Sequence, residues 1–226
     1  DQVFALWPTG VAPRTFDWLS KNIATGMLRD PNVAFRSEPD GVPSFALSME
    51  FDGAEVAFMP TLPPIEAAGG TLSIIDRRVA MTLNAGHVTA PEGGKIELAG
   101  STMVIPVTGI PNPPARFDLA MQGRVTAAMA ILNLEPFGVL RSSDLPVSFA
   151  QGAARIQAIL DTPLGRGIAP EQRVWSATAD VRNVRSDVLI PNRTITASSL
   201  QVQADPESLV VRGPMQLADV GGTVTF

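Results

Sequence analysis

The chain has 226 residues, of which 45% are apolar, 17% are charged and only 6% are aromatic. Its net charge of −5 and its only two lysines, Lys21 and Lys95, exclude the clustered basic surface that binding to nucleic acid requires. The absence of cysteine excludes disulfides and thiolate nucleophiles, while 19 Gly and 20 Pro among many small apolar residues indicate short strands joined by turns.

No stretch of the sequence has the pattern of a membrane span or a signal peptide. No apolar run approaches the roughly 20 residues that cross a bilayer as a helix. The first ten residues, DQVFALWPTG, lack the basic start and the long apolar core of a secretory signal. We therefore expect the chain to be a soluble piece of a longer protein.

The first predicted element is a short amphipathic helix over Arg14–Ala24, which forms a helical cap at about 14–26. Its apolar residues recur at spacings of three and four, and Gly26 suits the left-handed residue past a helix end. Its polar face mixes Asp17 with Lys21, whereas helices that lie on membranes carry many basic residues there. The pattern favours packing on the rest of the protein over contact with a membrane.

From residue 33 to about 123 the sequence alternates between apolar and polar residues, which is the period of half-buried strands. The clearest case is FALSMEF at 45–51, and the Asp52-Gly53 that follows it predicts a hairpin turn. A connection with a strand-breaking residue at each end is predicted at 62–70.

Two more strand pairs are predicted in this half. The segments 71–75 and 79–83 alternate on either side of a charged turn. The segments 95–98 and 102–107 form a third predicted pair around Gly100.

The centre of the chain combines a strand with a second short helix. Residues 115–123 alternate, and after Gly123 the spacing changes to three and four, which predicts a helix at about 125–134 ending before Pro136. The helix face that we expect to be buried comprises Val125, Ala128, Met129 and Leu132.

Strands resume at about 147–226, with predicted strands at 147–149, 153–160 and 174–181. At least ten alternating segments against two helical ones predict a mainly β fold: an elongated, antiparallel, repeating β-groove made of a curled sheet with two short helices. We expect the whole of 1–226 to be a single segment of this groove.

The chemistry of an enzyme is missing from the sequence. The one histidine, His87, has no neighbouring nucleophile, and no Ser lies in a Gly-x-Ser-x-Gly turn. Gly93-Gly94 is a turn without the Lys and Ser/Thr of a phosphate-binding loop. We therefore expect a protein that is not an enzyme, with no metal and no cofactor, in which His87 is structural.

The order of turn and cap residues resembles the AsmA-like family of bacterial envelope proteins, most closely the central region of its YhdP and TamB type. The likeness extends over nearly the whole chain and is carried by residues that set turns and caps. They are Trp7-Pro8, Arg14, Trp18, Asn22, Gly26, Leu62-Pro63-Pro64-Ile65, the run Gly93-Gly94-Lys95-Ile96-Glu97-Leu98-Ala99-Gly100-Ser101, Pro113-Pro114-Ala115, Gly123, Pro136, Gly152-Ala153 and Pro163-Leu164.

The resemblance implies a segment of a periplasmic protein, anchored in the inner membrane by parts outside this chain, that conducts phospholipid along an apolar groove between the two membranes. Its expected partners are phospholipid acyl chains and bacterial membranes, with no nucleic acid, and the oligomeric state is left open. The alternative is a periplasmic scaffold or assembly factor for outer-membrane proteins, in which the same apolar faces close into a core. The alternation of apolar and polar residues along the strands is the same in both cases, so it does not distinguish them.

The candidate lipid-binding residues are the in-phase apolar residues of the predicted strands, which should line one continuous concave face. They are Phe45, Leu47, Met49, Val56, Phe58, Leu72, Ile74, Val79, Met81, Leu83, Phe117, Leu119 and Met121.

Overall fold

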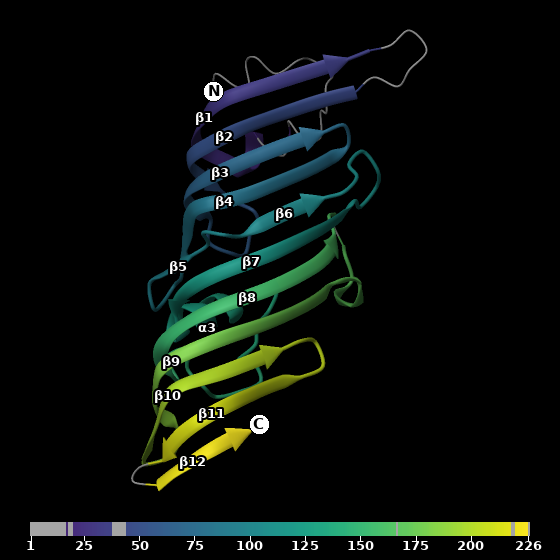
Figure 1. Cartoon of the computed structure of the whole chain (residues 1–226). Coiled ribbons are helices and arrows are strands. Elements are labelled where there is room, and N and C mark those ends of the chain that lie inside the picture. The colour runs from purple at the N-terminus through teal and green to yellow at the C-terminus, as the bar shows by residue number, and fades with distance from the viewer. Residues whose placement is uncertain (1–16, 18–19, 38–43, 166, 218–219, 226) are drawn as a thin grey trace.

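The computed structural model describes residues 17, 20–37, 44–165, 167–217 and 220–225. They form one antiparallel sheet of 12 strands, which confirms the mainly β fold predicted from the sequence. Figure 1 shows the strands stacked in one elongated, curled sheet with the N-terminal and C-terminal strands at opposite ends. The strands are β1 Ile23–Arg36, β2 Ser44–Val56, β3 Ile65–Ile75, β4 Arg78–Thr89, β5 Lys95–Glu97, β6 Thr102–Ile105, β7 Pro114–Arg124, β8 Gln151–Pro163, β9 Val174–Ile190, β10 Arg193–Ala204, β11 Leu209–Leu217 and β12 Val220–Thr225.

The order of strands across the sheet follows the order of the chain, so each strand pairs with its sequence neighbours. The short strands β5 and β6 are the exception. The sequence predicts that they pair with each other, but in the structure they do not. Both lie between β4 and β7, end to end, and together they occupy the place of one strand. Ser101 spans this interruption: its Oγ donates to the carbonyl of Ala120 (3.1 Å) and accepts from the amide of the same residue (3.0 Å).

Several strands contain a β-bulge at a similar level, and these bulges bend the sheet. In β2 the Asp52-Gly53 pair, predicted as a hairpin turn, is a bulge inside one long strand, with φ of 60° at Gly53. Register shifts also occur in β3 near Ala67, whose φ is 50°, and where β9 pairs with β8, near Asn183 with φ of 53°. Because a bulge increases local twist and bend, a row of them curls the sheet into a groove.

Helix α3, Val125–Leu132, lies on the concave side and packs against β5, β7 and β8. The predicted helix is confirmed, but its predicted buried face is only partly right: Ala128 packs against the buried cluster, whereas Leu132 is 38% exposed, and the fully buried residues are Ala127 and Ala130. Small alanine side chains let the helix backbone approach the sheet closely. The helix therefore belongs to the one compact apolar cluster of the described residues, together with Leu83, Val88, Ile96 and Leu98.

Two other predicted elements differ from the structure. The helical cap predicted at 14–26 ends early, because β1 begins at Ile23; among its described residues, Asp17 and those at 20–22 are helical, and the remainder lies outside the described part. Lys21 and Asp17 form an ion pair (Nζ–Oδ1 2.6 Å). The segment 147–149, predicted as a strand, is a turn, and β8 begins only at Gln151.

Candidate functional site

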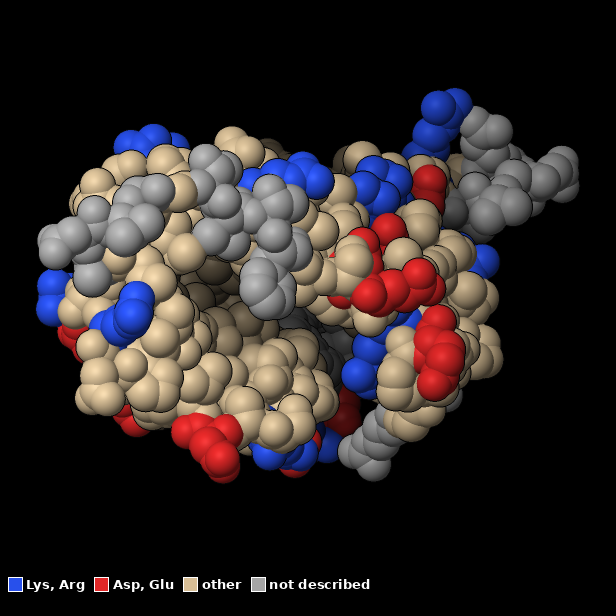
Figure 2. Space-filling view, turned by 90° about the horizontal axis from the view of Figure 1, so that it is seen from below, with Lys and Arg blue, Asp and Glu red and all other residues tan. Residues whose placement is uncertain are grey.

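The concave face of the sheet is the face that carries α3, and the strand register defines which side chains belong to it. Leu83 and Met121 pack in the cluster with the helix, so the residues in phase with them point to the same side. Figure 2, which looks along the stack of strands, shows a hollow bordered mainly by uncharged residues.

The structure places every predicted lipid-binding residue on this concave face except Phe58. Pairing aligns Leu47 with Ile74 and Ile74 with Val79, so that in-phase residues of neighbouring strands share one side. Val56 returns to the same face because the bulge in β2 restores the phase: it pairs with Ile65. Phe58 lies beyond the end of β2 and is 41% exposed.

The concave face is divided into a helix-capped half and an open half. In the capped half, Leu83 is buried at 5% exposure, and Val56 and Met121 pack against the cluster that contains α3. The remaining predicted residues on the face are only half-buried. No large side chain of the described residues is fully buried, so the open half is not the interior of a closed core.

The open half contains a row of large side chains that runs along the sheet, across seven strands, which we call the axial ladder. Successive members are directly opposite each other in neighbouring strands. The axial ladder consists of Met49, Leu72, Met81, Met103, Phe117, Leu160 and Trp175.

Met103, Leu160 and Trp175 were missed by sequence reasoning. Met103 lies in the run TMVIP, which is apolar at consecutive positions, so alternation alone does not say which side faces the groove. The pairing of Met103 with Met81 and Phe117 shows that its side chain faces the groove. Leu160 and Trp175 follow the phase of β8 and β9, and their alternation was the signal that could have found them.

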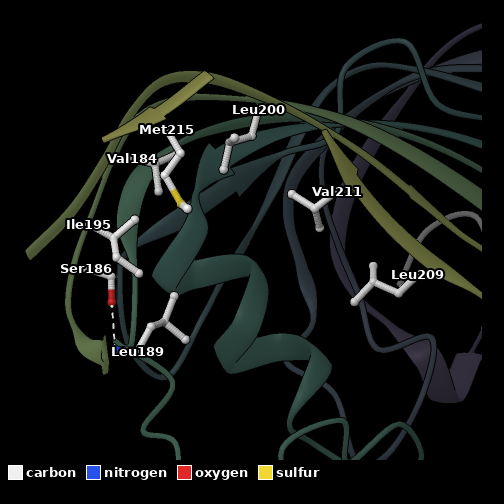
Figure 3. A pocket seen from close by; sticks show the side chains of 8 residues that line it. All are labelled: Val184, Ser186, Leu189, Ile195, Leu200, Leu209, Val211 and Met215. Atoms are coloured by element: carbon white, nitrogen blue, oxygen red, sulfur yellow. Dashed lines mark hydrogen bonds between the residues drawn. The ribbon is translucent and has the colours of Figure 1, made fainter. Parts of the chain in front are cut away.

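Towards the C-terminal end, the concave face deepens into an apolar pocket of about 210 Å³ (Figure 3). Its one polar side chain is Ser186, whose Oγ donates to the carbonyl of Phe149 and accepts from the amides of Val188 (3.3 Å) and Leu189 (3.2 Å). The Ser186 hydroxyl therefore makes its hydrogen bonds within the protein. The pocket is lined by Val184, Ser186, Leu189, Ile195, Leu200, Leu209, Val211 and Met215.

Charges lie on the opposite, convex face. Arg116 there contacts Asp161 (3.2 Å) in the neighbouring strand and Asp118 (3.4 Å) in its own strand, and all three are about half exposed. At the paired positions of β2 to β8 that the structure describes, no concave position carries Asp, Glu, Lys or Arg. Over these strands the concave face is thus an uncharged apolar strip that can accept hydrocarbon but offers no ionic partner.

His87 has a partner that the sequence did not reveal. Its Nε2 lies 3.2 Å from Glu66 Oε2 in the adjacent strand. Within the described part of the chain, no three His, Asp or Glu side chains are grouped so as to hold a metal ion. No helix among the described residues is long and apolar enough to span a membrane.

Comparison with known proteins adds no relative: no protein-family model, no curated protein and no solved structure matches this chain.

Proposed function

We propose that this chain is a segment of an AsmA-like periplasmic protein that binds phospholipid acyl chains on its concave face and conducts them along the groove. Parts of the protein outside this chain would anchor it in the inner membrane, and the lipid would pass between the inner and outer membranes. The observation that carries the proposal is the open half of the concave face, a long apolar strip without charge that stays half-exposed.

The surface area supports an open groove. The chain presents 14553 Å² of accessible surface, whereas a compact monomer of its 23.9 kDa would present roughly 9,900 Å². Soluble monomers rarely leave contiguous apolar patches larger than a few hundred Å² open to water, because water contact with apolar atoms is unfavourable. An apolar strip that extends across seven strands therefore calls for an apolar occupant, whereas a closed scaffold core would bury it.

The residues of the strip suit a flexible hydrocarbon chain. Each methylene that leaves water contributes about 0.8 kcal/mol, and no specific hydrogen bond is needed. The eleven strand positions across the sheet, at about 4.8 Å each, give a path of roughly 48 Å. Methionines and aliphatic residues along the axial ladder offer many equivalent contacts, which allows a bound chain to slide.

The test uses a matched pair of substitutions at adjacent positions of β3. Leu72→Asp puts a charge on the axial ladder, and Thr71→Asp puts the same charge on the convex face, where Thr71 is exposed. Native mass spectrometry of purified protein should detect bound phospholipid in the wild type and in Thr71→Asp. Leu72→Asp should lose the lipid and should not transfer fluorescent phospholipid between vesicles.

Failure would be clear from the same samples. If folded wild-type protein carries no phospholipid and transfers none, the groove is not a lipid path. If Leu72→Asp loses lipid only because the protein has unfolded, as shown by its circular dichroism spectrum, the closed scaffold becomes the better explanation.

A further inference from the structure

Methionines gather in one part of the concave face. Of the eight methionines in the chain, Met49, Met81 and Met103 belong to the axial ladder. Met81 and Met103 are direct cross-strand partners, and Leu72 lies between Met49 and Met81. Together with Leu72, these three methionines therefore form a continuous patch across strands β2, β3, β4 and β6.

The patch is accessible to small molecules from the groove. All three side chains are half-buried, and none packs in the cluster around α3. Met121 differs, because it does pack against that cluster. A thioether that borders an open hollow can meet both a hydrocarbon chain and a dissolved oxidant.

Methionine sulfur reacts with two-electron oxidants such as hydrogen peroxide or hypochlorous acid. The sulfur loses two electrons and gains one oxygen atom, and the peroxide is reduced to water. The product, methionine sulfoxide, replaces an apolar side chain with a polar one, and methionine sulfoxide reductases reverse the change.

We propose that Met49, Met81 and Met103 form an oxidation-sensitive patch of the groove, at which conversion of the thioethers to sulfoxides weakens the binding of hydrocarbon chains. This inference rests on the proposed function, because it concerns the same apolar face. It assigns to these methionines a second property that leucine would lack.

The physical reason lies in the surroundings of the new oxygen. Its neighbours across the strands are apolar: Leu72 beside Met81, and Phe117 beside Met103. The strand amides already serve the sheet, and no charged side chain lies on this face at the described paired positions. A bound hydrocarbon chain would remove water from the sulfoxide oxygen, which has no hydrogen-bond donor in the groove to replace that water. This loss should weaken the binding of a hydrocarbon chain that contacts the sulfoxide by about tenfold.

The experiment measures the affinity of the full chain for a BODIPY-labelled fatty acid before and after mild peroxide treatment. Peptide mass spectrometry shows which methionines have been oxidised, and circular dichroism reports the fold. The test variant replaces all three methionines by leucine, a change of shape that cores tolerate well. The matched control is Met27→Leu, because Met27 lies opposite Asp52 and is 58% exposed.

Oxidation should weaken the affinity of the wild type and of Met27→Leu by about tenfold while the sheet persists. The affinity of the triple leucine variant, whatever its value before treatment, should not change on oxidation, and treatment with the reductases should restore the affinity of the oxidised wild type. Equal affinity before and after oxidation of the three residues would overturn the proposal. So would an equal loss in the triple variant, or a loss that accompanies unfolding. If the wild type fails to bind the probe before any oxidation, the proposed function itself fails and this inference with it.

Discussion

A side-chain carbon built at Gly93 would collide with the backbone nitrogen of Ala127, so the turn between β4 and β5 rests directly on the first turn of α3. No side chain fits between the two backbones. This contact, together with the buried Ala127 and Ala130, holds the helix over one half of the groove and leaves the other half open.

Gly93→Ala should therefore destabilise the protein more than the same change at the next residue. Both Gly93 (φ 87°) and Gly94 (φ 95°) have left-handed backbones, so alanine costs about 1–2 kcal/mol of conformational strain at either position. Only at Gly93 does the new methyl meet backbone, which should add about 1–3 kcal/mol. Urea unfolding of both variants measures the difference; equal midpoints would mean that the contact with α3 is unimportant.

Charge on the concave face should have different effects in its two halves. Leu83→Asp places a carboxylate in the buried cluster and should lower the free energy of unfolding by about 3–5 kcal/mol. Leu72→Asp, on the half-buried ladder, should lower it by only about 1 kcal/mol, since the carboxylate can stay hydrated. Thermal melts of the two variants compare the halves directly, and similar large losses would contradict an open half.

Ser101→Ala should remove the bridge across the interruption between β5 and β6. The buried hydroxyl satisfies both the amide and the carbonyl of Ala120, and without it these backbone groups lose a partner. The expected loss is about 1–3 kcal/mol. Ser176→Ala is the control, because Ser176 is exposed on the convex face; its midpoint in urea should match that of the wild type.

The β10–β11 turn should weaken in acid. Hydrogen bonds from the amide of Glu207, the hydroxyl of Ser208 and the amide of Ser208 hold the pKa of Asp205 below its ordinary value near 3.8. A depressed folded-state pKa stabilises the turn above the unfolded-state value, and the stabilisation is lost as the pH falls through the folded-state pKa. The protection factor of the Ser208 amide, which corrects for the pH dependence of intrinsic exchange, should fall over that range in the wild type; Asp205→Asn should show no such transition.

The alternation of the sequence predicted the fold class and nearly all of the candidate face, because a two-residue period survives wherever strands are long and half-buried. Leu47, Leu72, Met81 and Phe117 were placed correctly for that reason. The same reasoning failed at Asp52-Gly53, which has the composition of a turn but is a bulge within β2. Turn residues and bulge residues share the left-handed backbone, so composition does not distinguish them.

The helix face could not be predicted from hydrophobicity. The larger residues Met129 and Leu132 suggested the buried side, but close approach to the sheet selects the smallest side chains, Ala127 and Ala130. Which helix residues are buried therefore depends on how the shape of the helix fits the surface of the sheet, and the helix sequence alone does not show that surface. Met103 illustrates a similar gap, since its side of the strand depends on pairing with residues far apart in the sequence.

The agreement between strand order and chain order has a consequence for how the protein folds. Each strand after the first can add to an edge that the preceding segment has just formed. Folding therefore requires few contacts between residues that are far apart in the sequence. Such a linear assembly behaves as a row of coupled units, each stabilised mainly by its neighbours. We expect hydrogen exchange to be slowest near β7 and β8, where α3 packs, and to become faster towards both ends of the row. Damage to a terminal hairpin should then remain local, and the middle of the sheet should melt at an unchanged temperature.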